Sequence, residues 1–220
     1  IDSHAYKAAM ALGKKIEDVT KEERQAIKSV AHGWNYGRGK NSIAEEIGLS
    51  TKEVEEFLRK LNKSFPAIPA WHLKIQQQLR ATRTLITPFG RKRTFMGRWG
   101  DSLFREGYAF LPQSTVADYT NKALLRLCAL YNNVNYEDII ISSIPSNKSI
   151  FQLSTSLNKT QILHQCHDEI LALVQEEAVE NYIKIAKSII EQSFWCETGM
   201  LTIPVDIKVG RTWGECEKWK

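Results

Sequence analysis

His167, Asp168 and Glu169 lie between two short apolar runs and form the first group in this chain that could do chemistry. The flanking residues alternate or cluster as they do in strands, which predicts an antiparallel hairpin at 162–174 with the charges at its tip. Adjacent carboxylates repel one another unless a cation or water lies between them, so the tip is a candidate divalent-metal site. The alternative is a solvated turn, because ionised side chains are normally exposed.

Arg24, Lys28 and His32 form a second group, recurring at every fourth residue near the start of the chain. Each such step turns about 40° around a helix, so the three side chains share one face. A row of charge-assisted donors suits the oxygens of a polyphosphate, although a face that is only solvated is the alternative. Glycines bracket Tyr36, whose ring could stack on a base or belong to the core.

Composition limits the class of protein. Among 220 residues, Lys and Arg (30) outnumber Asp and Glu (25), and the resulting net charge of +5 is compatible with a polyanionic partner. The cysteines contain no CxxC pair, which argues against a zinc ribbon or a disulfide scaffold. No apolar stretch is long enough to span a bilayer and no signal peptide is evident, so we expect a cytoplasmic protein.

Several elements must position these groups. Thr20 and Glu23 form a capping box that predicts the start of the helix bearing the cationic row. Composition and periodicity predict further helices at 5–12, 42–47, 51–62, 69–81, 115–132 and 175–194. Strands are predicted at 84–86, 91–95 and 201–210, and an insertion or hairpin at 134–160. This order of elements predicts an α+β fold.

Two of these segments resemble motifs of the DNA polymerases of the pol I type, family A. The sequence from Arg24 to Gly37 is similar to the RxxxKxxx(F/Y)GxxYG helix of the family's fingers, and 166–169 resembles its VHDE catalytic hairpin. Four further segments are similar to family motifs in the expected order: Asp2-Ser3-His4 (DxH), 87–93 (T-x-x-GRRR), 105–118 (R…NxPxQGTAAD) and 204–213 (P-x-x-V-x-x-G-x-x-W). The resemblance covers nearly the whole chain.

The resemblance implies the C-terminal fragment of a template-directed DNA polymerase, an enzyme that adds dNTPs to a primer 3′ end by two-metal phosphoryl transfer. It implies a mainly helical fingers subdomain at 1–109, which includes a basic hairpin at 84–95. The C-terminal part of a palm subdomain would follow at 110–220, with the catalytic hairpin 162–174 and a C-terminal helix and strand. A bacteriophage branch is favoured by His32 and by the sequence of 110–114.

The resemblance also implies the roles of individual residues. Asp168 would bind metal, Glu169 would support it, and Lys28 would donate a proton to pyrophosphate. Rotation of the cationic helix would gate incorporation by bringing that helix and the acidic tip onto one nucleotide. The incoming dNTP would be held by His4, Arg24, Lys28, His32 and Tyr36. Primer and template DNA would be contacted by Arg91, Lys92, Arg93, Arg105, Gln113 and His167.

Two Mg²⁺ ions would be shared with a second aspartate, which the family carries in a DYSQxE-type segment ahead of the DxH motif. We therefore expect a second polypeptide that carries this aspartate, the thumb, the first half of the palm and any 3′–5′ exonuclease. The chain would polymerise only in its presence. A non-catalytic DNA-binding remnant of the same fold is the alternative. A stand-alone metallohydrolase using His164, His167 and Asp168 is disfavoured, because the sequence offers no second ligand cluster.

The sequence departs from the family pattern at four positions. His32 stands where most relatives have Phe or Tyr, so the family's sugar preference does not carry over to this chain. Ala109 replaces an Asn, Ser114 replaces a Gly, and Pro112 falls one place later than the family's proline. The last three departures lie in the segment that contains Gln113.

Overall fold

The computed structural model describes residues 2–131 and 160–219. The chain divides into two compact units, Ile1–Gln113 and Ser114–Lys220, and each is described by itself. Helices and small antiparallel hairpins make up the described elements, which confirms the predicted α+β class. The assignment of fingers to 1–109 and palm to 110–220 stays a prediction. The insertion predicted at 134–160 lies outside the described residues except for Thr160.

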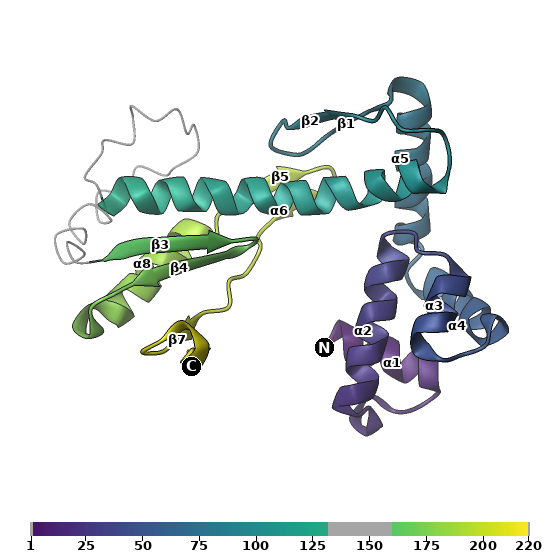
Figure 1. Cartoon of the computed structure of the whole chain (residues 1–220), viewed down its shortest axis with the longest axis horizontal. Coiled ribbons are helices and arrows are strands. Elements are labelled where there is room, and N and C mark those ends of the chain that lie inside the picture. Colours follow the sequence, from purple (N-terminus) through teal and green to yellow (C-terminus); the bar gives the residue numbers. More distant parts are fainter. Residues whose placement is uncertain (1, 132–159, 220) are drawn as a thin grey trace. The chain divides into compact units, whose positions relative to one another are not determined.

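Four α-helices open the first unit (Figure 1), and their ends follow the local sequence. Capping boxes start two of them, at Thr20 with Glu23 and at Ser50 with Glu53. Gly13 and Gly48 end the other two in the left-handed conformation that glycine adopts without strain. The elements are α1 (Ser3–Leu12), the 3₁₀ turn η1 (Ile16–Asp18), α2 (Lys21–Asn35), α3 (Lys40–Ile47) and α4 (Thr51–Ser64).

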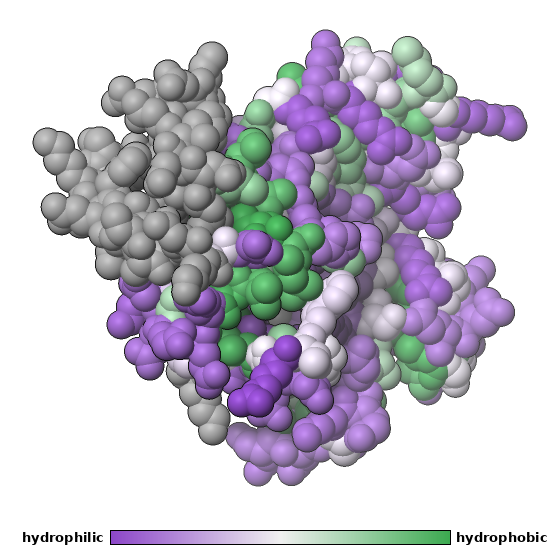
Figure 2. Space-filling view, turned by 60° about the vertical axis from the view of Figure 1, so that its left-hand side comes forward, coloured by the Kyte–Doolittle hydropathy of each residue, from purple (hydrophilic) through white to green (hydrophobic). Residues whose placement is uncertain are grey.

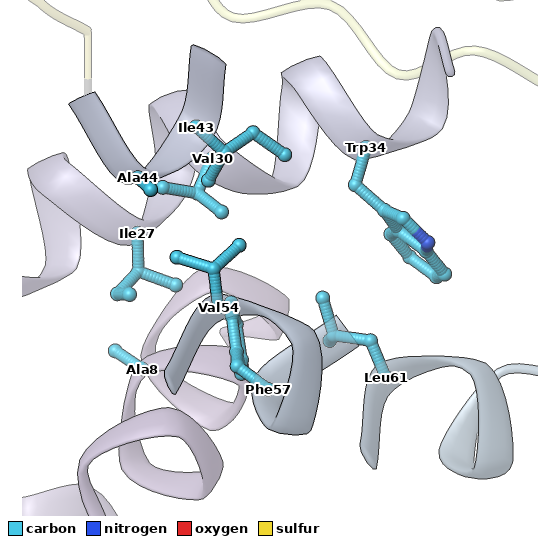
Figure 3. Packing of buried hydrophobic residues seen from close by; sticks show 9 residues of the cluster. All are labelled: Ala8, Ile27, Val30, Trp34, Ile43, Ala44, Val54, Phe57 and Leu61. Atoms are coloured by element: carbon cyan, nitrogen blue, oxygen red, sulfur yellow. The ribbon is translucent and has the colours of Figure 1, made fainter. Parts of the chain in front are cut away.

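A hydrophobic cluster holds these four helices together (Figure 3). Val30, Ile43 and Leu61 are almost fully buried in it, and they come from three different helices. Because the buried side chains of α2 occupy one side of that helix, its other side can carry the polar row. The cluster consists of Ala8, Ile27, Val30, Trp34, Ile43, Ala44, Val54, Phe57 and Leu61.

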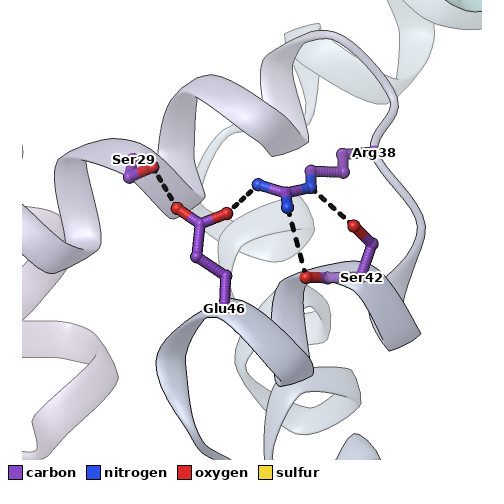
Figure 4. A network of polar contacts seen from close by, with 4 residues as sticks. All are labelled: Ser29, Arg38, Ser42 and Glu46. Atoms are coloured by element: carbon purple, nitrogen blue, oxygen red, sulfur yellow. Dashed lines mark hydrogen bonds and ion pairs between the residues drawn. The ribbon is translucent and has the colours of Figure 1, made fainter.

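A polar network ties the end of α2 to α3 (Figure 4). The Glu46 carboxylate accepts hydrogen bonds from the Ser29 hydroxyl and from the Arg38 guanidinium. Arg38 Nε also donates to the Ser42 hydroxyl at 2.9 Å. The Arg38 stem packs over Gly33, where an added Cβ would lie 2.9 Å from Arg38 Cδ. The glycine-rich joint after α2 is therefore held in place by a side chain that follows it.

The remainder of the first unit builds a second hydrophobic cluster around α5 (Ala67–Thr82) and the first turns of α6 (Asp101–Tyr131). The predicted hairpin is confirmed as β1 (Thr84–Ile86) paired antiparallel with β2 (Lys92–Thr94). Its buried Leu85 joins the cluster from the strand, and Phe95 joins it just beyond β2. The cluster contains Ile75, Leu79, Leu85, Phe95, Leu103 and Tyr108.

Helix α6 begins earlier than predicted. We expected a helix from residue 115. Pro112, which lacks an N–H, lies ahead of that start, and proline usually ends or kinks a helix. The observed helix begins at Asp101 and runs through Pro112. Leu103 and Tyr108 are buried in the second cluster, so packing of this face outweighs the lost hydrogen bond.

In the second unit, β3 (Gln161–Cys166) and β4 (Glu169–Leu173) form the predicted hairpin beside α6 and α8 (Val179–Ile190) (Figure 1). Ile162 and Ile170 pack against a cluster of Leu127, Ile185, Ala186 and Ile189. Gln165 Nε2 adds a hydrogen bond of 2.9 Å to Asn121 Oδ1 of α6. The hairpin is thus fixed through its apolar face.

The C-terminal elements are shorter than predicted. The helix expected at 175–194 is a 3₁₀ turn, η4 (Glu176–Ala178), followed by α8, and Phe194 already belongs to a strand. The strand expected at 201–210 is interrupted after Leu201. Pro204 follows three residues later, and proline has no N–H to donate to a neighbouring strand. Two hairpins result: β5 (Phe194–Cys196) pairs with β6 (Gly199–Leu201), and β7 (Lys208–Val209) pairs with β8 (Glu217–Lys218). The 3₁₀ turn η5 (Trp213–Glu215) lies in the connection from β7 to β8.

Candidate active site

The cationic row of α2 lies on the side of the helix that does not face the first cluster. Arg24 and Lys28 are partly buried and His32 is exposed, whereas Ile27, Val30 and Ala31 between them are buried. The predicted N-cap and capping box are both present, so the helix starts where the sequence indicated. The row is therefore presented by a helix whose other face is fixed in a core.

Asp2 connects this row to α1. Its Oδ1 accepts hydrogen bonds from the backbone N–H groups of His4 (2.8 Å) and Ala5 (3.1 Å), which makes it the N-cap of α1. Its Oδ2 lies 2.7 Å from both Nε and Nη2 of Arg24. These contacts, the Arg24 hydrogen bond above all, lower the pKa of Asp2 to about 2. One carboxylate thus fixes both the helix that carries His4 and the guanidinium of Arg24.

His4 lies beside His32, with ring centroids 5.9 Å apart and ring planes inclined at 30°. Its Nδ1 is buried and has no hydrogen-bond partner within the described part of the chain. Burial, followed by the charge of Lys7, lowers the pKa of His4 below its ordinary value. His4 is therefore a neutral imidazole at pH 7, next to the cationic row.

Tyr36 ends α2 and packs partly against the second cluster, while the side chain keeps some exposure. The following Gly37 has φ +72°, and a Cβ there would lie 2.7 Å from Tyr108. The Tyr108 ring in turn stacks on His72, whose Nε2 lies 2.7 Å from the Asn35 carbonyl oxygen. The close approach that glycine permits thus joins the end of α2 to α5 and α6.

The basic hairpin β1–β2 leaves Arg91 and Lys92 exposed. Arg93 is engaged within the unit: its Nη2 lies 2.8 Å from Glu106 Oε2, and its guanidinium lies 4.6 Å from the centre of the Phe95 ring. Arg105 and Gln113 are both exposed on α6. Eight residues separate them, which on a helix places their side chains about 80° apart.

The hairpin of β3 and β4, which is called the acidic hairpin below, turns at His167 and Asp168, because Cys166 pairs directly with Glu169. Glu169 is the first residue of β4, a correction to its expected place in the turn. His167 has φ +54°, a conformation that hairpin turns of two residues require and that side chains other than glycine adopt at a cost. All three side chains are exposed.

The structure brings the candidate residues together in separate groups. His4, Arg24 and His32 meet in the first unit, together with Asp2, whose contact with Arg24 we did not predict. The sequence signal for it was an aspartate immediately ahead of a helix. His167, Asp168 and Glu169 meet in the second unit. That both groups act on one nucleotide stays a prediction.

Metal ligands do not cluster in the part of the chain that the structure describes. No three His, Cys, Asp or Glu side chains of that part of the chain gather as a metal site. Two surface hollows, beside Tyr6 and Met10 and beside Val209 and Trp219, contain none of the candidate residues. Within 2–131 and 160–219, no helix combines the length and apolar character that crossing a membrane would need.

Comparison with known proteins gives a consistent result. Residues 1–215 match the model of DNA polymerase family A. The chain is 25% identical over 223 aligned residues to the thermostable DNA polymerase I of Thermus filiformis, a match that covers 99% of this chain and 24% of that protein. It is 29% identical over 154 residues to the DNA polymerase of Mycobacterium phage D29, covering 67% of this chain and 24% of the relative.

A solved structure has a similar fold. It is the POL domain of Pol1 from M. smegmatis in complex with DNA primer-template and dNTP, with a TM-score of 0.68 and 21% identity. The match covers 86% of this chain and 31% of that one. The chain thus spans about a quarter to a third of the length of these relatives.

Proposed function

The chain belongs to DNA polymerase family A, and on that premise we propose that it is the part of a template-directed DNA polymerase that holds the incoming dNTP and one catalytic carboxylate. The observation that carries the proposal is the grouping of Arg24, His32 and His4 on one polar side of α1 and α2. Two histidines and a guanidinium are suited to binding phosphate oxygens through directed hydrogen bonds.

In this proposal the residues of α2 hold the triphosphate. Arg24 and His4 donate hydrogen bonds to its oxygens, and Lys28 places a positive charge one turn further along and protonates the departing pyrophosphate. His32 and Tyr36 contact the sugar and base of the nucleotide. Rotation of α2 gates incorporation by bringing its cationic row onto the nucleotide.

The acidic hairpin supplies the carboxylate. Mg²⁺ is normally bound by one or two carboxylates together with substrate phosphates, and the exposed oxygens of Asp168 and Glu169 fit that need. Bound Mg²⁺ would neutralise phosphate charge and favour the ionised primer hydroxyl. His167 contacts the primer end, while Arg91, Lys92, Arg93, Arg105 and Gln113 contact DNA.

We further propose that activity requires a second polypeptide or segment carrying the other catalytic aspartate, the thumb and the first half of the palm. The relatives' greater length supports this, because they contain about three times as much sequence beyond the region matched here. A bacteriophage origin is supported by His32 and by the phage D29 relative.

Primer extension tests the proposal. The chain is mixed with a polypeptide bearing the remaining polymerase segments, and extension of a labelled primer is measured with Mg²⁺ and dNTPs. Asp168→Ala is expected to reduce extension by at least about 10³-fold, as the loss of a metal-binding carboxylate does. Asp206→Ala, which removes an exposed aspartate paired with Lys218, is the matched control and should extend normally.

Normal extension by Asp168→Ala would remove that residue from the mechanism. It would favour the second candidate function, a DNA-binding part without chemistry. One observation favours that candidate: the basic hairpin and Arg105 belong to the first unit, which does not include the acidic hairpin.

A further inference from the structure

The segment between β2 and α6 exposes large side chains in a basic neighbourhood. Residues 96–100 are all exposed, and Met96 and Trp99 keep 81% and 45% of their surface accessible. Neither residue lies in a segment that resembles a family motif, since those nearest are 87–93 and 105–118.

Arg83 braces the indole. Its guanidinium carbon lies 4.1 Å from the centre of the Trp99 ring, a stacked cation–π contact. The same guanidinium donates through Nη1 to the carbonyl oxygens of Phe95 (3.1 Å) and Gly97 (3.0 Å). One side chain therefore fixes both the ring and the backbone that leads to it.

Arg83 also adopts an unfavourable backbone conformation, with φ +54° at the end of α5. Among the non-glycine residues that the structure describes, only Arg83 and His167 have a positive φ. A glycine would take this conformation without strain, so the arginine side chain must be what the position requires. Strain of this kind concentrates at functional sites.

Trp99 and Arg83 belong to a larger group of arginines and aromatic rings in contact. Trp99 and Phe104 lie 6.2 Å apart between ring centres, and the guanidinium of Arg80 lies 5.5 Å from the Phe104 ring. From residue 80 to 106 the sequence has seven Lys or Arg and two acidic residues, of which Glu106 is paired with Arg93. Aromatic rings stack nucleobases, while cations beside them attract the phosphates that link the bases.

The alternative is that Trp99 only covers the second hydrophobic cluster, but this explains less of the geometry. Phe104 already packs against that cluster, whereas Trp99 stays 45% exposed with Arg83 against its ring. We propose that Trp99, braced by Arg83, is a stacking platform for an unpaired base of single-stranded DNA, such as the template beyond the primer. This inference rests on the proposed function for its ligand class.

DNA binding by the full chain tests the platform. Fluorescence anisotropy at one fixed salt concentration compares a labelled single strand, a primer-template with a 5′ overhang, and a blunt duplex. Trp99→Ala is expected to weaken binding of the first two by about 5- to 100-fold, as the loss of one stacked base does, and to leave the blunt duplex unchanged. The salt dependence should not change, because no phosphate contact is lost.

Matched variants exclude a folding effect. Trp195→Ala removes a tryptophan that is 72% exposed on β5 and should bind all three DNAs as the original chain does. Trp99→Phe keeps a ring, so it should retain most of the affinity. It should lose the part of the tryptophan fluorescence quenching by an oligothymidylate that Trp99 contributes, since five other tryptophans remain.

The outcomes separate the platform from the proposed function. Equal loss on all three DNAs, or no loss on any, with the original chain binding normally, would overturn the platform and leave the proposed function intact. If the original chain bound none of the three, the DNA contacts proposed for this chain would be contradicted, and the platform with them.

Discussion

At the scale of single residues, the two carboxylate oxygens of Asp2 have different roles, one structural and one electrostatic. Its Oδ1 caps α1 and its Oδ2 pairs with Arg24. The pairing lowers the pKa of Asp2 to about 2, so its stabilising effect is fully present above the ordinary value of 3.8 and is lost as the pH falls toward 2. Near neutral pH the Asp2 carboxylate that pairs with Arg24 is therefore ionised.

Substitution of Asp2 should separate these two tasks. Asp2→Asn keeps a good N-cap but weakens the hold on Arg24, so we expect an almost unchanged melting temperature and a several-fold higher KM for dNTP in the reconstituted enzyme. Asp2→Ala removes both contacts and should in addition lower the melting temperature by a few degrees. An unchanged KM in both variants would show that Asp2 serves only α1.

His4 should make nucleotide binding depend on pH. Its pKa lies below the ordinary 6.5 because of burial, of Lys7 and, to a lesser extent, of His32 and Arg24, while Asp2 opposes these effects. The folded chain therefore binds fewer protons there than the unfolded chain, and its stability falls as the pH drops below 6.5. An approaching triphosphate favours the charged imidazole, so binding takes up a proton.

The KM for dNTP is accordingly expected to decrease by a few-fold from about pH 7.5 to about pH 6 in the reconstituted enzyme. His4→Gln should abolish the part of this dependence that His4 contributes, while His32 stays in place as an unaltered neighbour. A pH profile identical in both proteins would exclude His4 from phosphate binding.

At the scale of elements, the joint after α2 depends on the absence of a side chain. Gly37 and Gly48 have nearly the same φ (+72° and +68°), but only at Gly37 would a Cβ meet other atoms, 2.7 Å from Tyr108. An alanine at Gly48 would therefore meet only backbone strain, whereas an alanine at Gly37 would meet the same strain and a steric clash.

Gly48→Ala is expected to lower the free energy of unfolding by about 1–2 kcal/mol, the cost of a left-handed alanine. Gly37→Ala should lower it by about 1–3 kcal/mol more, because the packed Tyr108 ring must move. Urea unfolding of both variants measures this difference. Equal losses would mean that Tyr108 yields without cost and that the joint is looser than its packing indicates.

At the scale of the whole molecule, the basic residues predict DNA binding that depends strongly on salt. The net charge is +5, and exposed Arg91 and Lys92 extend from the first unit on a short hairpin. Each phosphate contact that is lost should reduce, by about 1, the steepness with which the logarithm of the association constant falls against the logarithm of the salt concentration.

Lys92→Ala is therefore expected to weaken binding of every DNA by a similar factor and to flatten the salt dependence by about one unit. Lys60→Ala, an exposed lysine on α4, should leave both unchanged. Arg93 is less suitable for this measurement, since it also pairs with Glu106 and stacks on Phe95. A slope unaffected by Lys92→Ala would remove that residue from the DNA interface.

Local chemistry made most elements predictable. The capping box at Thr20, the terminal Gly13 and the turn at His167 fix their elements through contacts within a few residues. The start of α6 and the interruption after Leu201 were mispredicted. Pro112 remains in its helix because its neighbours are buried by partners distant in sequence, and no local rule contains that information.

The sequence by itself determined the family, the α+β class and the residues that carry the motifs, because these depend on residue type and spacing along one chain. Only the tertiary structure decided that Asp2 holds Arg24, that His4 lies against His32 and that Arg83 braces Trp99. Such contacts join residues 16 to 28 positions apart. They form only when burial of apolar side chains has brought whole helices together, and helical spacing alone does not specify which side chains then meet.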